Sequence, residues 1–113
     1  MSARSRDFER RLLDETVRRA GVEYGVHCPA YPAAVEQRLE LGAERYGDAA
    51  FLGRDNLREV LEETPDVAGY ALLELQARGG EQAPPRLFTA LRRVLLHGAL
   101  CDHHARVAGG EEL

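Results

Sequence analysis

The stretch Arg-Asp-Asn-Leu-Arg-Glu-Val-Leu-Glu-Glu-Thr-Pro-Asp-Val-Ala-Gly-Tyr-Ala-Leu-Leu-Glu-Leu, residues 54–75, decides the fold of this chain. A helix turns by about 100° per residue, so side chains three or four positions apart share a face. One wide face of this stretch is apolar and carries Leu57, Val60, Leu61, Thr64, Val67, Ala68, Ala71, Leu72 and Leu75. The opposite face carries a line of acids followed by apolar residues: Glu59, Glu63, Asp66, Tyr70, Leu73 and Ala77. We therefore predict a long central helix buried on two sides, with carboxylates at the edge of the second interface.

Helical periodicity also marks three other segments, so the sequence predicts an all-α domain with about four helices. The predicted helices cover residues 5–20, 33–46, 56–78 and 85–107. Glycine and proline between them indicate loops or linkers over residues 22–32, 47–54 and 79–85. No segment alternates with the period of a strand, and short connections are typical of a helical bundle. We expect the bundle to be dimeric through the central helix.

Turn and cap residues place the helix boundaries. Gly21 is predicted to end the first helix and Gly47 the second, since glycine accepts the left-handed conformation of a C-cap. Pro32 is predicted to open the second helix at its first position. Asn56 is a predicted N-cap for the central helix, with Glu59 completing a capping box three residues later.

Length and composition limit the classes of protein. The 113 residues predict a single domain over 1–113, with frayed ends at 1–4 and 108–113. No apolar run is long enough to span a membrane, and the first residues lack a signal-peptide core, so we expect a cytoplasmic protein with free thiols. All fifteen basic residues are arginine, against nineteen acids, and the net charge is −4. This balance disfavours nucleic-acid binding, and the lack of lysine excludes lysine chemistry.

Acidic side chains gather on two of the predicted helices. Glu36, Glu40 and Glu44 repeat at four-residue spacing, while Glu59, Glu62, Glu63 and Asp66 follow on the central helix. Arg58 is four residues from Glu62 and explains that acid as an ion pair. Glu63 and Asp66 have no such local partner. Antiparallel packing of the two helices would bring several carboxylates together, and a divalent cation such as Mg²⁺ would compensate their charge. A solvated helix face is the alternative.

The motif Glu63-Thr-Pro-Asp66 has the form ExxD, and Glu-Arg-Tyr-Gly-Asp, residues 44–48, precedes it on the upstream segment. This arrangement resembles the MazG-like all-α nucleoside triphosphate pyrophosphatase superfamily, in particular its short phage-type members. The resemblance covers about residues 35–75. It implies a helical, usually oligomeric enzyme that uses Mg²⁺ (or Mn²⁺) to hydrolyse a nucleoside triphosphate to a monophosphate and pyrophosphate.

The resemblance also implies roles for individual residues. Glu63 and Asp66 match the ExxD metal ligands, and Glu40 and Glu44 stand in for the upstream pair. The upstream acids are four residues apart, where the family has a tighter EExxE. The remaining implied roles are a general base at Glu44 or Glu59 and a substrate contact at Tyr70. Arg54 and Arg58, at the start of the central helix, are candidates for phosphate contacts; the alternative is that they are surface charges.

Pro65 leaves two interpretations of the central helix open. Proline removes an intrahelical hydrogen bond and bends a helix that continues through it. Alternatively, Thr64, Pro65 and Asp66 read as the N-cap and first positions of a new helix, which would bend or abolish the ExxD geometry. The alternative function is a non-catalytic helical module that keeps the fold and binds another protein. A DNA-binding regulator is disfavoured by the charge.

A second group of possible metal ligands lies in the last predicted helix. His97, Cys101 and His104 share one face, and histidine and cysteine at such spacing can bind Zn²⁺. His27 and Cys28 could add ligands from the loop. Alternatively, Cys101 is a small core residue, and His103 and His104 lie near the C-terminus of the helix, where the helix dipole favours a positive charge.

Overall fold

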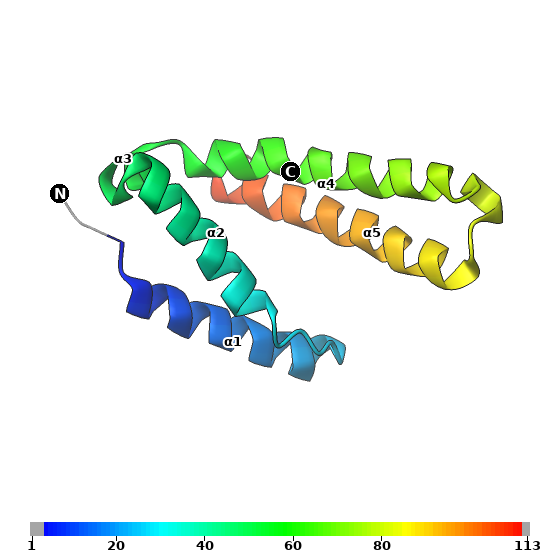
Figure 1. Ribbon diagram of the computed structural model, residues 1–113, viewed down its shortest axis with the longest axis horizontal. Coiled ribbons are helices and arrows are strands. Elements are labelled where there is room, and N and C mark those ends of the chain that lie inside the picture. The colour runs from blue at the N-terminus through cyan, green and yellow to red at the C-terminus, as the bar shows by residue number, and fades with distance from the viewer. Residues whose placement is uncertain (1–3, 112–113) are drawn as a thin grey trace. The chain divides into compact units, whose positions relative to one another are not determined.

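The chain is all-α, as the sequence predicts. A computed structural model describes residues 4–111, and no strand occurs among them. Four long helices and one short one are present (Figure 1): α1 (Arg6–Tyr24), α2 (Tyr31–Tyr46), α3 (Asp48–Gly53), α4 (Asn56–Ala77) and α5 (Pro85–Ala108). A 3₁₀ helix, η1 (Gly80–Gln82), lies between α4 and α5. No helix in the described part of the chain is long and apolar enough to cross a membrane.

The helices form two compact units, which divide between Arg54 and Asp55. Unit 1 contains α1, α2 and α3, and unit 2 contains α4, η1 and α5. The single domain over 1–113 stays a prediction.

Unit 1 is held at its start by a buried arginine. The Arg4 guanidinium donates to Glu9 at 2.8 and 2.9 Å, to the Leu39 carbonyl at 3.2 Å and to Glu40 at 3.1 Å. The residue is only 8 % exposed. Its charge is compensated by carboxylates, which is the condition for burying a guanidinium. Arg4 thus ties the start of the chain to α2, and the prediction of a frayed end is wrong at this residue.

Of the ends that were predicted to fray, residues 1–3 and 112–113 lie outside the described part of the chain. Within the described part, α5 continues to Ala108. Backbone amides of Gly109 and Gly110 then donate to the carbonyls of Ala105 and Val107, both at 3.0 Å.

The first helix begins as its sequence directs but ends later than predicted. Ser5 caps α1 by accepting a hydrogen bond from the Phe8 amide at 3.2 Å. Gly21 lies inside the helix, so its predicted role as a stop is wrong. The helix ends instead at Gly25, whose φ of 66° is the left-handed conformation that glycine tolerates without strain. The helix α1 therefore ends at Tyr24, about one turn later than predicted.

The second helix ends where the sequence predicts, and a short helix replaces the predicted loop after it. Gly47 ends α2 with a φ of 81°. Residues 47–54 are not a simple loop, because α3 covers Asp48–Gly53. Phe51 of α3 packs its ring against Gly42 of α2 and lies 6.2 Å from the Tyr46 ring. This contact packs α3 against α2.

The central helix of unit 2 continues through Pro65, so a restart at Thr64 is wrong. The Thr64 hydroxyl donates to the Val60 carbonyl at 2.7 Å. Pro65 has no N–H for the Leu61 carbonyl, and the helix continues without that bond. The N-cap is Asp55, which accepts from the Arg58 amide at 3.0 Å. The predicted cap at Asn56, and with it the Glu59 capping box, is wrong by one residue.

Helices α4 and α5 lie side by side and antiparallel, joined through η1 (Figure 1). Ala71 and Leu75 of α4 are buried, as are Ala83 before α5 and Ala105 within it. Within residues 4–111, the buried residues of α4 therefore lie on one side of the helix only. The predicted second buried side is exposed, with Tyr70 at 72 % and Leu73 at 63 %.

Candidate functional site

The acidic pair Glu63 and Asp66 lies three residues apart on the continuous helix α4, which places both carboxylates on one face. Both residues are exposed. Neither side chain forms a hydrogen bond or an ion pair with any residue between 4 and 111. The pair is therefore available to a cation, as the ExxD resemblance implies.

The acids that precede this pair on α4 have other surroundings. Arg58 donates to Glu62 at 3.0 Å, which confirms the predicted ion pair. That bond engages the Arg58 guanidinium, which is one of the two arginines predicted as candidates for phosphate contacts. Glu59 is half-buried in the first turn of the helix, where a carboxylate is favoured by the helix dipole.

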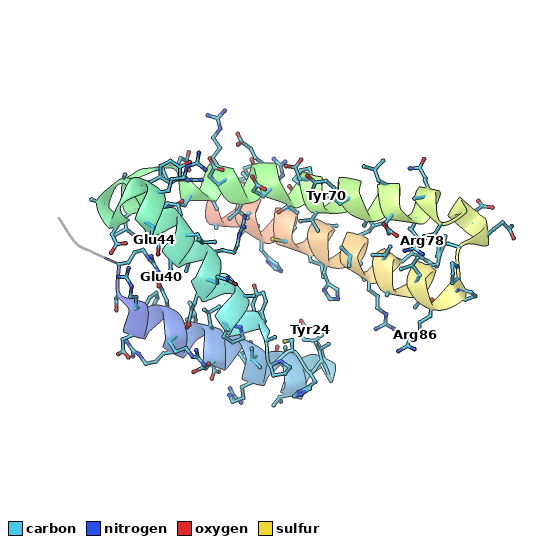
Figure 2. All side chains as sticks on the ribbon, in the orientation of Figure 1. Tyr24, Glu40, Glu44, Tyr70, Arg78 and Arg86 are labelled. Atoms are coloured by element: carbon cyan, nitrogen blue, oxygen red, sulfur yellow. The ribbon has the colours of Figure 1, made fainter. Side chains whose placement is uncertain are left out.

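The two upstream glutamates of α2 differ from each other (Figure 2). Glu40 accepts from Arg6 at 2.8 and 3.1 Å and from Arg4 at 3.1 Å. These bonds, those from Arg6 foremost, hold the pKa of Glu40 below its ordinary value. A metal ion at Glu40 would have to compete with two guanidiniums. Glu44, one turn further, is exposed and has no ion pair within residues 4–111, so it remains available.

The predicted four-carboxylate site spans both units. Glu40 and Glu44 belong to unit 1, and Glu63 and Asp66 belong to unit 2. Within each unit, the members of a pair share a helix. The described residues contain no group of three or more histidine, cysteine, aspartate or glutamate side chains that could hold a metal ion. Convergence of the two pairs stays a prediction.

The remaining predicted substrate contacts belong to different units. Tyr70 is exposed on α4, one turn after Asp66 (Figure 2). Arg54 lies in unit 1, where its guanidinium carbon is 5.3 Å from the centre of the Phe51 ring. Arg54 lines a surface of unit 1 that was not predicted from the sequence.

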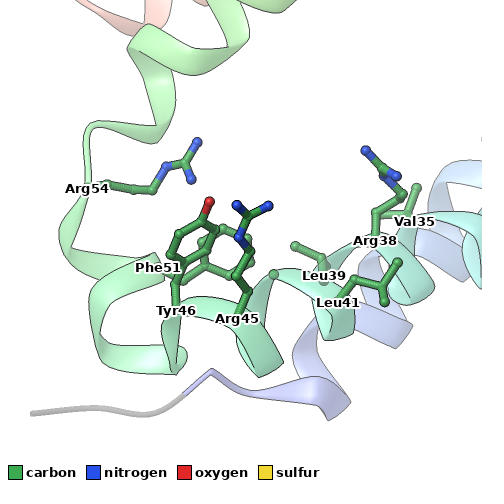
Figure 3. Close-up of a pocket in the computed structure, with 9 residues that line it drawn as sticks. Val35, Arg38, Leu39, Leu41, Arg45, Tyr46, Phe51 and Arg54 are labelled. Carbon is green, nitrogen blue, oxygen red and sulfur yellow. The ribbon is translucent and has the colours of Figure 1, made fainter.

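That surface is a groove of about 680 Å³ formed by α2, α3 and the residue that follows them (Figure 3). It is lined by Val35, Arg38, Leu39, Leu41, Gly42, Arg45, Tyr46, Phe51 and Arg54. Three of these residues are arginines and two are aromatic. The sequence signal was the i, i+7 spacing of Arg38 and Arg45, which puts both on one face of α2 about two turns apart.

The residues of the predicted zinc group are on α5, apart from His27 and Cys28, which belong to unit 1. Cys101 is exposed, so its alternative interpretation as a core residue is wrong. Its Sγ lies 3.7 Å from the Thr64 hydroxyl of α4. His104 packs edge-on against His103, with 5.3 Å between ring centres. Zinc binding stays a prediction.

Comparison with protein-family models, with curated proteins and with solved structures gave no match to this chain. The resemblance to the MazG-like superfamily therefore depends on the quoted residues alone.

Proposed function

We propose that the chain is a Mg²⁺- or Mn²⁺-dependent nucleotide pyrophosphohydrolase of the MazG-like type, which converts a nucleoside triphosphate to a monophosphate and pyrophosphate. The observation that supports this function best is the pair Glu63 and Asp66. Their carboxylates are adjacent, exposed and without a cationic partner among residues 4–111. The continuity of α4 through Pro65 preserves the i, i+3 spacing that an ExxD pair needs.

In this function Glu63 and Asp66 would hold the metal ion. A bound Mg²⁺ would compensate the charge of phosphate oxygens and make the attacking water more acidic. A remaining carboxylate, Glu59 or Glu44, takes the proton from the attacking water. The water oxygen then forms a bond to the α-phosphorus, and the bond from that phosphorus to the bridging oxygen breaks, so pyrophosphate leaves.

Release of pyrophosphate from a panel of ribo- and deoxyribonucleoside triphosphates, with Mg²⁺ or Mn²⁺, tests this function. Glu63→Gln and Asp66→Asn should each abolish release, while the circular dichroism spectrum stays that of the unsubstituted chain. Glu62→Gln is the matched control, because Glu62 is the neighbouring acid and already pairs with Arg58. No release from any nucleotide by the unsubstituted chain would exclude the enzyme.

A homo-oligomer, expected as a dimer through the central helix, belongs to the same proposal. Leu96, Leu100 and Val107 share a second face of α5, and they are 57, 45 and 49 % exposed. Tyr70 and Leu73 extend the exposed apolar surface onto α4. A two-helix unit cannot cover two apolar faces of each helix, so a second copy of unit 2 is the partner that completes a bundle.

The alternative proposal is a non-catalytic helical interaction module. It is favoured by the bonds from Arg4 and Arg6 to Glu40, which occupy one predicted metal ligand. The two functions differ in a simple measurement. Mg²⁺ or Mn²⁺ should raise the melting temperature of the enzyme, because binding to the folded state stabilises it, whereas the module should show no shift.

A further inference from the structure

The groove between α2 and α3 combines positive charge with exposed aromatic rings. Figure 3 shows Arg45 and Arg54 beside the Tyr46 and Phe51 rings at one end of the groove, with Arg38 at the other end. Leucine side chains lie between these two ends. Its volume of about 680 Å³ is in the range of small-molecule sites.

Two arginines of the groove, Arg38 and Arg45, differ from the arginines of α1. Every arginine of α1 forms an ion pair with a carboxylate; these residues are Arg6, Arg10, Arg11, Arg18 and Arg19. Arg38 and Arg45 form no ion pair with any carboxylate of residues 4–111, and the lining of the groove contains no aspartate or glutamate. Positive charge without a carboxylate partner, in a chain of net charge −4, points to an anionic ligand.

The rings give the groove a second kind of recognition. Tyr46 and Phe51 are 6.2 Å apart and tilted by 42°. The guanidinium carbon of Arg45 lies 5.3 Å from the centre of the Tyr46 ring, and that of Arg54 lies 5.3 Å from the Phe51 ring. The Tyr46 side chain is exposed. A planar ring of a ligand can stack on these aromatic and guanidinium surfaces, while the guanidinium N–H groups donate to phosphate oxygens.

From these contacts we propose that the groove binds a small anion that carries both phosphate and an aromatic ring, of the nucleoside phosphate class. Arg38 and Arg45 contact the phosphates, and the ring stacks on Tyr46. Since no carboxylate lines the groove, this binding requires no metal ion and does not use Glu63 or Asp66. The groove is therefore a ligand site beyond the proposed reaction.

Isothermal titration calorimetry of the full chain with ATP, GTP, CTP and TTP, in buffer that contains EDTA, tests this site. At least one nucleotide should bind, and Arg38→Gln and Arg45→Gln should each weaken it by about tenfold or more. Tyr46→Leu should weaken it by about tenfold through lost stacking. Arg11→Gln is the matched control, because it removes the same charge from unit 1 outside the groove and should leave binding unchanged.

Further ligands and variants separate the possible results. Glu63→Gln should keep the affinity measured in EDTA, even if it abolishes hydrolysis, so the two proposals fail independently. Inorganic triphosphate and the free nucleoside should both bind more weakly than the nucleotide. Equal affinity for inorganic triphosphate would overturn the role of the rings. Tighter binding of an oligonucleotide would show a nucleic-acid surface instead, and no binding of any nucleotide would overturn the site.

Discussion

The Phe51 ring of α3 rests directly on Gly42 of α2, and a Cβ atom added at Gly42 would overlap the ring at its Cζ and Cε2 atoms. Gly42→Ala must therefore displace the ring or separate the two helices. Overpacking of this kind costs about 1–3 kcal/mol, more than the helix propensity that alanine contributes. We expect a net loss in the free energy of unfolding, measured by urea titration.

Gly69→Ala is the control for that substitution. Gly69 also lies inside a helix, α4, but no heavy atom of the described residues lies within 4 Å of a Cβ built there, outside the helix's own backbone. Alanine should raise the free energy of unfolding by about 0.5–1 kcal/mol, because it restricts the unfolded chain and favours the helix. Equal effects of the two substitutions would contradict the contact between Gly42 and Phe51.

The ion pairs of Arg4 and Arg6 should make the stability of unit 1 decrease at acidic pH. A hydrogen bond from Arg4 holds the pKa of the Glu9 carboxyl below its ordinary value. Hydrogen bonds from Arg6 do the same for the carboxyls of Glu40 and Asp48. A carboxyl whose pKa is lower in the folded state stabilises the fold above its unfolded pKa and loses that effect as the pH falls. The stabilisation should therefore be complete above about pH 4.5 and decline below it.

Arg4→Gln tests this prediction. Removing the guanidinium should cost about 1–3 kcal/mol at pH 7, the range for hydrogen bonds to charged groups. The difference between the variant and the unsubstituted chain, from urea titrations at pH 7 and pH 3, should shrink at the lower pH. A difference that is the same at both values would show that Arg4 acts through packing alone.

The sequence predicted those features that depend on local side-chain chemistry. Helical periodicity gave the long helices, and Gly47 gave the end of α2, because the left-handed conformation is a local property of glycine. The ion pair of Arg58 with Glu62 followed from i, i+4 spacing. Features that depend on contacts distant in sequence were missed. Arg4 is buried by residues of α1 and α2, and α3 is favoured by the contact of its Phe51 with α2.

The candidate site divides in the same way. Spacing alone identified Glu63 and Asp66 as acids without a local partner, and the structure retains that property. Spacing could not show that Glu40 accepts from Arg6, because 34 positions separate the two residues. Nor could it reveal the groove, which needs Phe51 to fold back over α2. Tertiary contacts, rather than propensity, decided each of these cases.

The second apolar face of α5 predicts self-association. Leu100→Glu places a charge in the middle of the Leu96, Leu100 and Val107 face and should convert an oligomer to a monomer, because a buried unpaired carboxylate is costly. Size-exclusion chromatography with light scattering measures the change. Val22→Glu is the control, since Val22 is 74 % exposed on α1. If the unsubstituted chain is monomeric at high concentration, the oligomer is excluded.

The helix α4 continues through Pro65, although proline has no N–H to donate to the Leu61 carbonyl. Pro65→Ala restores a donor for the Leu61 carbonyl and removes a ring that clashes with it, which favours the folded helix by up to about 3 kcal/mol. The greater freedom of alanine in the unfolded chain offsets about 0.4–1 kcal/mol of this gain. We therefore expect a net rise of about 1–2 kcal/mol in the free energy of unfolding.

The same variant tests whether Pro65 serves the carboxylates on either side of it. Proline bends a helix that continues through it, so alanine should change the direction of Asp66 relative to Glu63. Pyrophosphate release should then fall while the free energy of unfolding rises. Such opposite changes are expected where a strained residue is retained for function. A variant that is more stable and equally active would show that Pro65 contributes nothing to the ExxD geometry. Lower stability would instead contradict the continuous helix on which the acidic pair depends.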